Sequence, residues 1–217
     1  MPILERRYGA LNCLISTPPC EPPRGAWPIL VFLHGKGECA PAPLAHALAL
    51  HGPLRNGSAP EATRDFIVVA PQLPAPGGDV WVSHTADVNS IPAAIASDYG
   101  GDRSRAYLTG FSYGGNGVLR IGSSKAGEWA ASWAVEPPGG RAKRDGRPLW
   151  LSAGPLSPER KDSIEGSEDR NGSEDLPKLR IFDDPGRDHV GTAVSAYEDG
   201  AIYRWRLKHS LPIKASA

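Results

Sequence analysis

Residues 110–115, which read GFSYGG, place Ser112 between glycines two positions before it and two positions after it. A serine hydroxyl is a weak nucleophile, so it needs a neighbouring base and donors for the oxyanion that forms when it attacks a carbonyl group. Glycines at these positions let a strand turn sharply into a helix, which exposes the serine. A structural turn is the alternative. The apolar run before the motif and the plausible helix after it favour Ser112 as a nucleophile.

A second glycine-rich segment, HGKGE at residues 34–38, follows the first long apolar run. A loop at this point can donate one backbone N–H to an oxyanion, and we expect the other N–H to come from Tyr113, the residue after the nucleophile. Gly35 permits close approach and is a candidate substrate-binding residue, with an ordinary Gly-rich turn as the alternative. His34 is expected to stabilise the loop by hydrogen bonding rather than to act as a base.

The base is expected near the carboxyl end of the chain. In parallel sheets whose strands alternate with helices, catalytic residues of this kind usually follow one another along the chain in the order serine, acid, histidine. Six histidines occur, namely His34, His46, His51, His84, His189 and His209. His189 follows the last predicted strand and precedes the last predicted helix, whereas His209 lies within that helix. We therefore predict His189 as the base, with a surface-loop histidine as the alternative.

Strands and helices that position these residues are predicted from recurring apolar runs, each ending at a turn with Gly or Pro. The predicted strands are residues 29–33, 66–70, 106–109, 129–135, 149–153 and 179–182. The first three are continuous rather than alternating, which is typical of strands buried on both faces. Helices are predicted at residues 44–50, 87–99, 115–125 and 201–209, although Pro92 makes the beginning of the second uncertain. Such alternation predicts a mostly parallel sheet covered on both faces, with its site at the carboxyl ends of the strands.

Length and charge point to one domain spanning residues 1–217, because 217 residues suit a single core. Lys and Arg together number 24, as do Asp and Glu, so no basic excess suggests binding to nucleic acid or to an anionic membrane. The segment at residues 157–178 is highly charged and is expected to be a solvated helix and loop rather than a second domain.

Three cysteines, Cys13, Cys20 and Cys39, fit no zinc pattern and are expected to be reduced thiols, with a Cys13–Cys20 bridge as the alternative. No apolar run reaches the roughly 18 residues of a membrane span, and the first residues lack the apolar core of a signal peptide. We therefore expect a cytoplasmic protein without stable membrane association. No metal constellation or phosphate-binding loop occurs, so neither a metal nor a cofactor is predicted. The oligomeric state is not indicated.

Four blocks of the chain resemble small esterases of the α/β-hydrolase class: the phospholipase/carboxylesterase and dienelactone-hydrolase-like proteins, with their predicted-peptidase and polyhydroxybutyrate-depolymerase-like relatives. The blocks are residues 28–38 (PILVFLHGKGE), 51–53 (HGP) with 66–74 (FIVVAPQLP), 102–115 (DRSRAYLTGFSYGG), and 188–189 (DH) with 196–197 (AY) and Leu207. The resemblance implies the α/β-hydrolase fold without a large cap domain. It also implies Ser112 as nucleophile, His189 as base, and an oxyanion hole of backbone N–H groups near Lys36 and Tyr113.

One departure from this family concerns the acid of the triad. The family usually has an Asp in a G-x-x-D turn after the strand that matches residues 149–153, but here the turn at residues 154–157 reads GPLS. A triad needs a group that holds the histidine tautomer and stabilises the imidazolium. Glu136, at the end of the preceding strand, is the candidate acid, as in some α/β-hydrolases. Glu159 or Asp162, a Ser–His dyad, an impaired hydrolase and a merely solvated Glu136 are the alternatives.

These features predict a serine carboxylesterase that works through an acyl-enzyme on a small-molecule ester. A peptidase or thioesterase with the same machinery is one alternative, and a non-catalytic binding protein with a degraded triad is another. Only about a dozen residues separate Glu136 from Leu149, which leaves no room there for a large cap and favours an open site. Trp81 either lines the acyl or alcohol pocket or is a packing residue.

Overall fold

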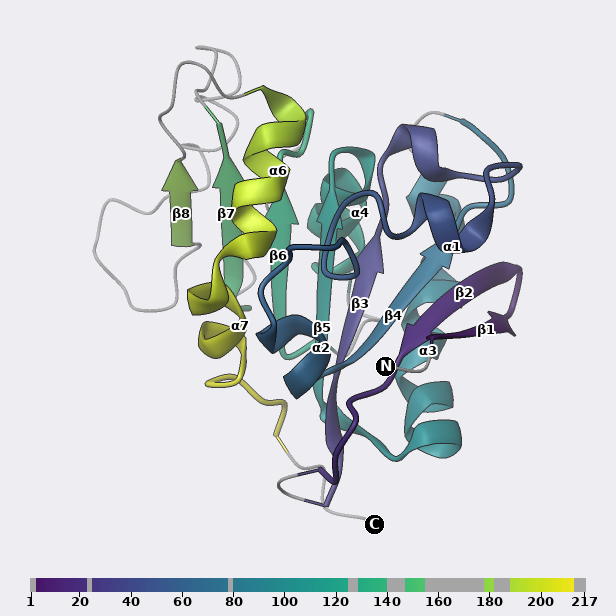
Figure 1. Ribbon diagram of the computed structural model, residues 1–217, viewed down its shortest axis with the longest axis vertical. Helices are drawn as coiled ribbons and strands as arrows, with labels where there is room; N and C mark the ends of the chain where they lie inside the picture. Colours follow the sequence, from purple (N-terminus) through teal and green to yellow (C-terminus); the bar gives the residue numbers. More distant parts are fainter. Residues whose placement is uncertain are drawn as a thin grey trace.

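The computed structural model describes residues 3–22, 25–77, 80–124, 129–139, 147–154, 178–181 and 188–212. Within these residues eight strands form one sheet in the order β1-β2-β4-β3-β5-β6-β7-β8 (Figure 1). The strands are β1 (Ile3–Tyr8), β2 (Leu11–Ser16), β3 (Trp27–Leu33), β4 (Ile67–Gln72), β5 (Gly101–Phe111), β6 (Ala131–Val135), β7 (Leu149–Ala153) and β8 (Lys178–Ile181). The pairings from β4 to β8 are parallel, and β1 and β2 add two antiparallel pairings at one edge. The sheet is therefore mostly parallel, as predicted.

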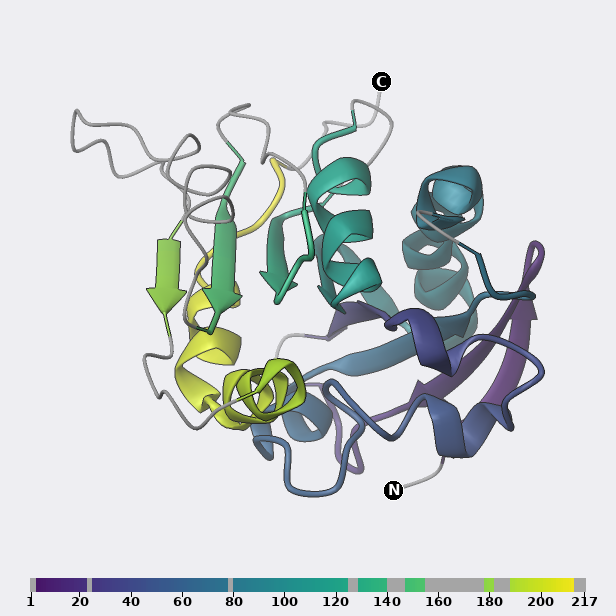
Figure 2. The ribbon, with the colours of Figure 1, turned by 90° about the horizontal axis from the view of Figure 1, so that it is seen from above.

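Helices cover both faces of this sheet. They are α1 (Leu44–Ala47), α2 (Glu61–Asp65), α3 (Thr85–Tyr99), α4 (Tyr113–Ile121), α6 (His189–Glu198) and α7 (Gly200–Arg206), with short 3-10 turns η1 (Lys36–Glu38) and η2 (Val80–His84). Figure 2 shows α3 and α4 on one side of the sheet and α2, α6 and α7 on the other. The buried residues form two matching clusters, so that Val31 of β3 packs with the first pair of helices and Phe32 with the second group. A strand buried on both faces requires the continuous apolar run seen in the sequence.

Differences from the predicted elements have local causes. The strands β1 and β2 are absent from the predicted elements: β1 is an edge strand whose mostly exposed residues show little apolar pattern, whereas β2 is short and buried but its apolar run is interrupted by Asn12. Helix α3 continues through Pro92, which lies inside it. The carboxyl end of the chain holds two helices rather than one, and His189 is the first residue of α6 instead of part of a preceding loop.

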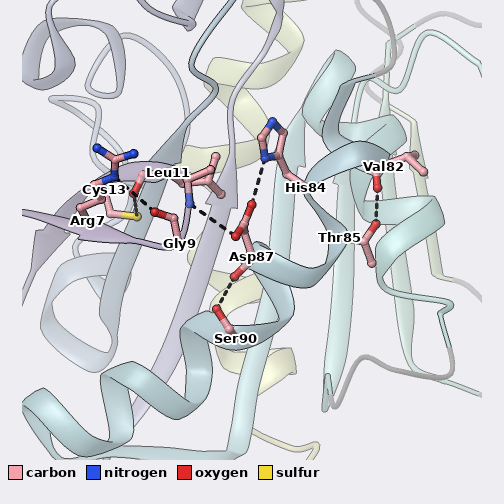
Figure 3. Close-up of polar contacts among 10 residues, drawn as sticks. Arg7, Gly9, Leu11, Cys13, Val82, His84, Thr85, Asp87 and Ser90 are labelled. Carbon is pink, nitrogen blue, oxygen red and sulfur yellow. Dashed lines mark hydrogen bonds and ion pairs between the residues drawn. The ribbon is translucent and has the colours of Figure 1, made fainter.

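The β1–β2 turn is fastened to the start of α3 by Asp87 (Figure 3). The Asp87 carboxylate accepts the N–H of Ala10 at 3.4 Å and contacts His84 Nδ1 at 3.0 Å. Gly9 in this turn has a φ of +58°, and a Cβ at Gly9 would lie 2.1 Å from Asp87 Oδ1. A residue with a side chain would therefore meet both backbone strain and the anchoring carboxylate.

We expect Gly9→Ala to lower the free energy of unfolding by about 2 kcal/mol, because it adds a steric clash to the strain of a positive φ. Gly100→Ala is the matched control, since Gly100 has a φ of +67° but open space around its Cβ position. The control should lose only about 1 kcal/mol. Urea unfolding of both variants measures the difference, and equal losses would contradict the anchoring role of Asp87.

Two further observations concern the cysteines and the predicted lack of a membrane span. The three cysteines are free thiols, with Cys13 and Cys39 buried and Cys20 exposed. Within the part of the chain that the structure describes, no helix is long and apolar enough to cross a membrane.

Candidate active site

Ser112 lies at a sharp turn between β5, which ends at Phe111, and α4, which begins at Tyr113. Its backbone is strained, with φ 56° and ψ −119°. The Ser112 N–H donates to the carbonyl of Val135 at 2.9 Å, and the Ser112 carbonyl accepts the N–H of Asn116 at 3.1 Å. A strained residue held in this way by the neighbouring strand and by the following helix is typical of a nucleophile elbow.

The first turn of α4 lies directly against the end of β3. A Cβ at Gly114 would be 1.9 Å from the carbonyl oxygen of Leu33, and a Cβ at Gly115 would be 2.8 Å from the carbonyl oxygen of Val135. The glycines after Ser112 therefore permit close backbone contact with strands on both sides of the elbow. This contact places Ser112 at the carboxyl ends of β3 and β6, where the sequence predicted the site.

The segment after β3 is held in one geometry by hydrogen bonds of His34 and Glu38. The His34 Nδ1–H donates to the carbonyl of Gly35 at 2.6 Å, and His34 Nε2 accepts the N–H of Leu73 at 3.0 Å. Burial lowers the pKa of His34 to about 4, so the ring is neutral at physiological pH. The prediction that His34 stabilises this loop by hydrogen bonding is thus confirmed by its two partners.

The loop also lies next to the nucleophile. A Cβ at Gly35 would be 3.5 Å from the Cβ of Ser112 and 3.1 Å from Glu38 Oε2. The Gly35 N–H donates to Glu38 Oε2 at 2.6 Å, so it is engaged within the loop. Lys36 is the first residue of η1 and Tyr113 the first of α4, and N–H groups at such positions have no partner inside their own helix. The two predicted oxyanion donors are therefore the first residues of two helical segments, one of which begins directly after Ser112.

Trp81, one of the two predicted substrate-binding residues, is completely buried. Its indole N–H donates to the carbonyl of His34 at 3.1 Å, and its ring meets the His34 ring edge-on at 5.0 Å between centroids. A side chain without exposed surface does not line a pocket, so the packing alternative describes Trp81. Trp81 packs against His34 in the loop after β3.

Glu136 follows β6 directly and reaches two neighbouring elements. Its Oε2 lies 2.7 Å from His189 Nδ1, and its Oε1 accepts the N–H of Gly154 at the end of β7. The Glu136 N–H donates to the carbonyl of Ser152 at 2.8 Å, and its φ is +49°, in the left-handed region. Only 2 % of the residue is exposed. Glu136 is thus a buried carboxylate with a fixed position, and the alternative of a merely solvated side chain does not describe it.

The turn that lacks the family's Asp thus contributes to the site through its backbone. Gly154 begins that turn and supplies the N–H that orients Glu136. The two downstream alternatives for the acid, Glu159 and Asp162, and the turn residue Ser157 lie outside the described residues.

His189 is positioned by the beginning of α6. Asp188 is the N-cap of this helix, and its side chain accepts the N–H of Gly191 at 2.6 Å. The His189 ring lies against Phe111, the residue before Ser112, with 4.8 Å between ring centroids and 36° between the planes. Because a carboxylate accepts at Nδ1, the proton belongs there and Nε2 has the free lone pair that a base needs. The His189 side chain is 43 % exposed, so substrate can reach it.

His51 is a second histidine at this site, and sequence reasoning did not assign it a role. The His51 ring packs against the ring of Phe111, which also contacts His189, with 5.0 Å between the centroids of His51 and Phe111. Burial, then the charges of Arg55 and His189, lowers the pKa of His51. The signal in the sequence is the HGP block at residues 51–53, which carries the family likeness but does not by itself indicate chemistry.

Comparisons with known proteins rest on structure alone. No protein-family model and no curated protein sequence matches the chain. A thermostable esterase superimposes with a TM-score of 0.71 at 18 % identity over 96 % of this chain, which spans 63 % of that esterase. An S-formylglutathione hydrolase from Agrobacterium tumefaciens gives a TM-score of 0.66 at 16 % identity, covering 95 % of this chain and 94 % of that one.

A third solved structure, from Xanthomonas campestris, is described as an α/β serine hydrolase without a lid. It gives a TM-score of 0.60 at 16 % identity and covers 95 % of this chain and 93 % of that one. These proteins and the present chain share the mixed sheet with helices on both faces, and no large cap is evident among the described residues. The chain therefore has the α/β-hydrolase fold.

Proposed function

We propose that this chain is a serine hydrolase that cleaves carboxylic esters of small molecules through an acyl-enzyme. The observation that carries the proposal is the 2.7 Å contact between Glu136 Oε2 and His189 Nδ1, next to a serine on a strained elbow. A nucleophile, a base and a group that orients the base are the three parts that such catalysis needs. Likeness of fold does not by itself supply the activity.

The first half of the proposed reaction forms the acyl-enzyme. Ser112 Oγ attacks the ester carbonyl carbon while His189 Nε2 takes the hydroxyl proton. Glu136 stabilises the imidazolium that results, and the N–H groups of Lys36 and Tyr113 stabilise the oxyanion. The bond to the alcohol oxygen then breaks, and His189 returns its proton to that oxygen, so that the alcohol leaves and the acyl group stays on Ser112.

The second half regenerates the enzyme. Water attacks the acyl carbon while His189 Nε2 takes one of its protons, and the bond between the acyl carbon and Ser112 Oγ breaks. The proton passes from His189 to Ser112 Oγ, and the carboxylic acid is released. Neither a metal nor a cofactor takes part in this proposal.

The substrate is proposed to be a small or extended ester, because no large cap encloses the site within the described residues. Gly35 remains a predicted substrate contact, since it lies beside Ser112. A thioesterase with the same machinery is the second candidate, favoured by the likeness to an S-formylglutathione hydrolase. The non-catalytic alternative depends on the missing Asp of the family turn, and the contact of Glu136 with His189 supports the catalytic proposal instead. The cytoplasmic location stays a prediction.

A fluorophosphonate probe followed by peptide mass spectrometry tests the proposal directly. We expect one adduct per chain on Ser112, because only an activated serine reacts with such a probe at neutral pH. Ser112→Ala, checked to be folded by circular dichroism, should take up no label. A folded parent chain that remains unlabelled would contradict the proposal and favour the non-catalytic alternative. Comparison of acetyl esters with matched thioesters then separates the two hydrolase candidates.

A further inference from the structure

Glu38 is a buried glutamate beside Ser112. The proposed reaction steps give its carboxyl group no role. Only 3 % of the residue is exposed, and burial raises the pKa of its carboxyl group to about 7. Within the described residues no cation pairs with it, and its Oε1 has no hydrogen-bond partner. Burying a carboxyl group in this way costs free energy that an apolar residue would not cost, which suggests a role in the site.

The contacts of Glu38 all bear on the oxyanion loop. Its Oε2 accepts the N–H of Gly35 at 2.6 Å, and its backbone carbonyl accepts from Gln72 Nε2 at 2.9 Å. Gln72 Nε2 also donates to the carbonyl of Ala42 at 2.9 Å. The backbone at position 38 is therefore anchored from β4, and the Glu38 side chain in turn holds the N–H of the peptide between His34 and Gly35.

The carboxyl group is also close to the reacting centre. A single point, the Cβ position of Gly35, lies 3.1 Å from Glu38 Oε2 and 3.5 Å from the Cβ of Ser112. An ionised carboxylate at this range opposes the negative charge that develops on the substrate oxygen, whereas a neutral carboxyl group does not. An ionised Glu38 would therefore destabilise the transition state that the N–H groups of Lys36 and Tyr113 are proposed to stabilise.

The titratable groups around Glu38 do not neutralise it. His34, at the end of β3, is held neutral by burial, and the phenol of Tyr197 from α6 is kept protonated because burial raises its pKa. Lys36 on the same turn is exposed, and the Cys39 thiol donates to the carbonyl of Lys36 at 3.4 Å. Deprotonation of Glu38 therefore adds an uncompensated negative charge next to the site.

We propose that Glu38 is a positioning residue of the oxyanion hole: it holds the Gly35 N–H so that the N–H of Lys36 is presented to the substrate, and it supports catalysis best when its carboxyl group is neutral. This inference rests on the proposed function. An ordinary helix cap would also bind the Gly35 N–H, but it would not couple the charge of residue 38 to turnover.

The pH dependence of kcat separates the two roles. With p-nitrophenyl acetate as substrate, kcat of the parent chain should fall above neutral pH as Glu38 ionises. Glu38→Gln, which mimics the neutral acid, should keep kcat within about threefold of the parent near pH 6 and lack the fall, exceeding the parent by about tenfold near pH 9. Glu61→Gln is the matched control, because Glu61 carries the same charge on α2, before the amino end of β4. It should retain the parent profile.

Loss of the hydrogen bond is tested by Glu38→Ala. We expect kcat to fall by about 10²-fold at all pH values with KM changed by less than about threefold, since the oxyanion donor and not substrate binding is disturbed. If the parent turns over and Glu38→Gln has the same pH profile as the parent, the role proposed for Glu38 is overturned but the proposed function is not. This conclusion holds even if Glu38→Ala fails to fold. A parent chain that neither turns over nor labels would overturn the proposed function, and the role of Glu38 with it.

Discussion

Glu136→Gln is expected to lower kcat by about 10⁴-fold, as loss of the acid of a Ser–His–Asp triad does. Glutamine has the shape of glutamate, but it has one acceptor oxygen where Glu136 uses two. That oxygen can accept the N–H of Gly154 or the Nδ1–H of His189, and not both. If it turns to Gly154, the amide NH₂ faces His189 and favours the wrong tautomer. In either arrangement the negative charge that stabilises the imidazolium is lost.

Steady-state kinetics on an activated ester measures this effect, with KM expected to change little because the lost interaction belongs to the transition state. Glu5→Gln serves as the control, since Glu5 is exposed on the edge strand β1 and undergoes the same change of charge. A folded Glu136→Gln variant with kcat within about threefold of the parent would contradict the triad proposed here. The acid would then be Glu159 or Asp162, or the site would be a dyad.

Gly114→Ala is expected to lower the free energy of unfolding by about 4 kcal/mol or more. The added Cβ would lie 1.9 Å from the carbonyl oxygen of Leu33 and 2.7 Å from that of His34. Both are backbone atoms of a buried strand end, so relief of the clash requires β3 and α4 to move apart at the elbow. The variant should therefore also lose the activity of Ser112, because the oxyanion loop begins at His34.

Gly139→Ala is the matched control, because a Cβ at Gly139 meets nothing within 4 Å and its φ is not positive. The control should stay within about 0.5 kcal/mol of the parent. Urea unfolding of both variants measures the difference, and failure of Gly114→Ala to accumulate as folded protein while the control does so agrees with the prediction. Equal stability of the two variants would mean that the elbow is looser than the contacts of Gly114 indicate.

Local sequence was enough to predict most of the central sheet and to single out two residues of the candidate site. The continuous apolar run that forms β3 has no polar face, because both sides of that strand are buried, and such a pattern is visible without a structure. Ser112 could be singled out because the glycines that permit its elbow are adjacent to it in the chain. His189 followed from its place after the last predicted strand. In contrast, the edge strand β1 was not predicted, since an exposed strand need not carry an apolar pattern.

The proposed acid, the loop after β3 and the burial of Trp81 depended on tertiary structure. Glu136 and His189 are 53 residues apart, and only the parallel pairing of β6 with β7 and the position of α6 bring their side chains together. From the sequence, Glu136 remained one of several carboxylates that could serve. Trp81 had two equal interpretations until its burial was known, and Glu38 showed nothing unusual before its carboxyl group was found enclosed next to Ser112. Residue types and local spacing thus determined which chemistry is available to the chain. Long-range packing decided which side chains lie together at the candidate site, because contact and burial depend on segments that come together only when the chain folds.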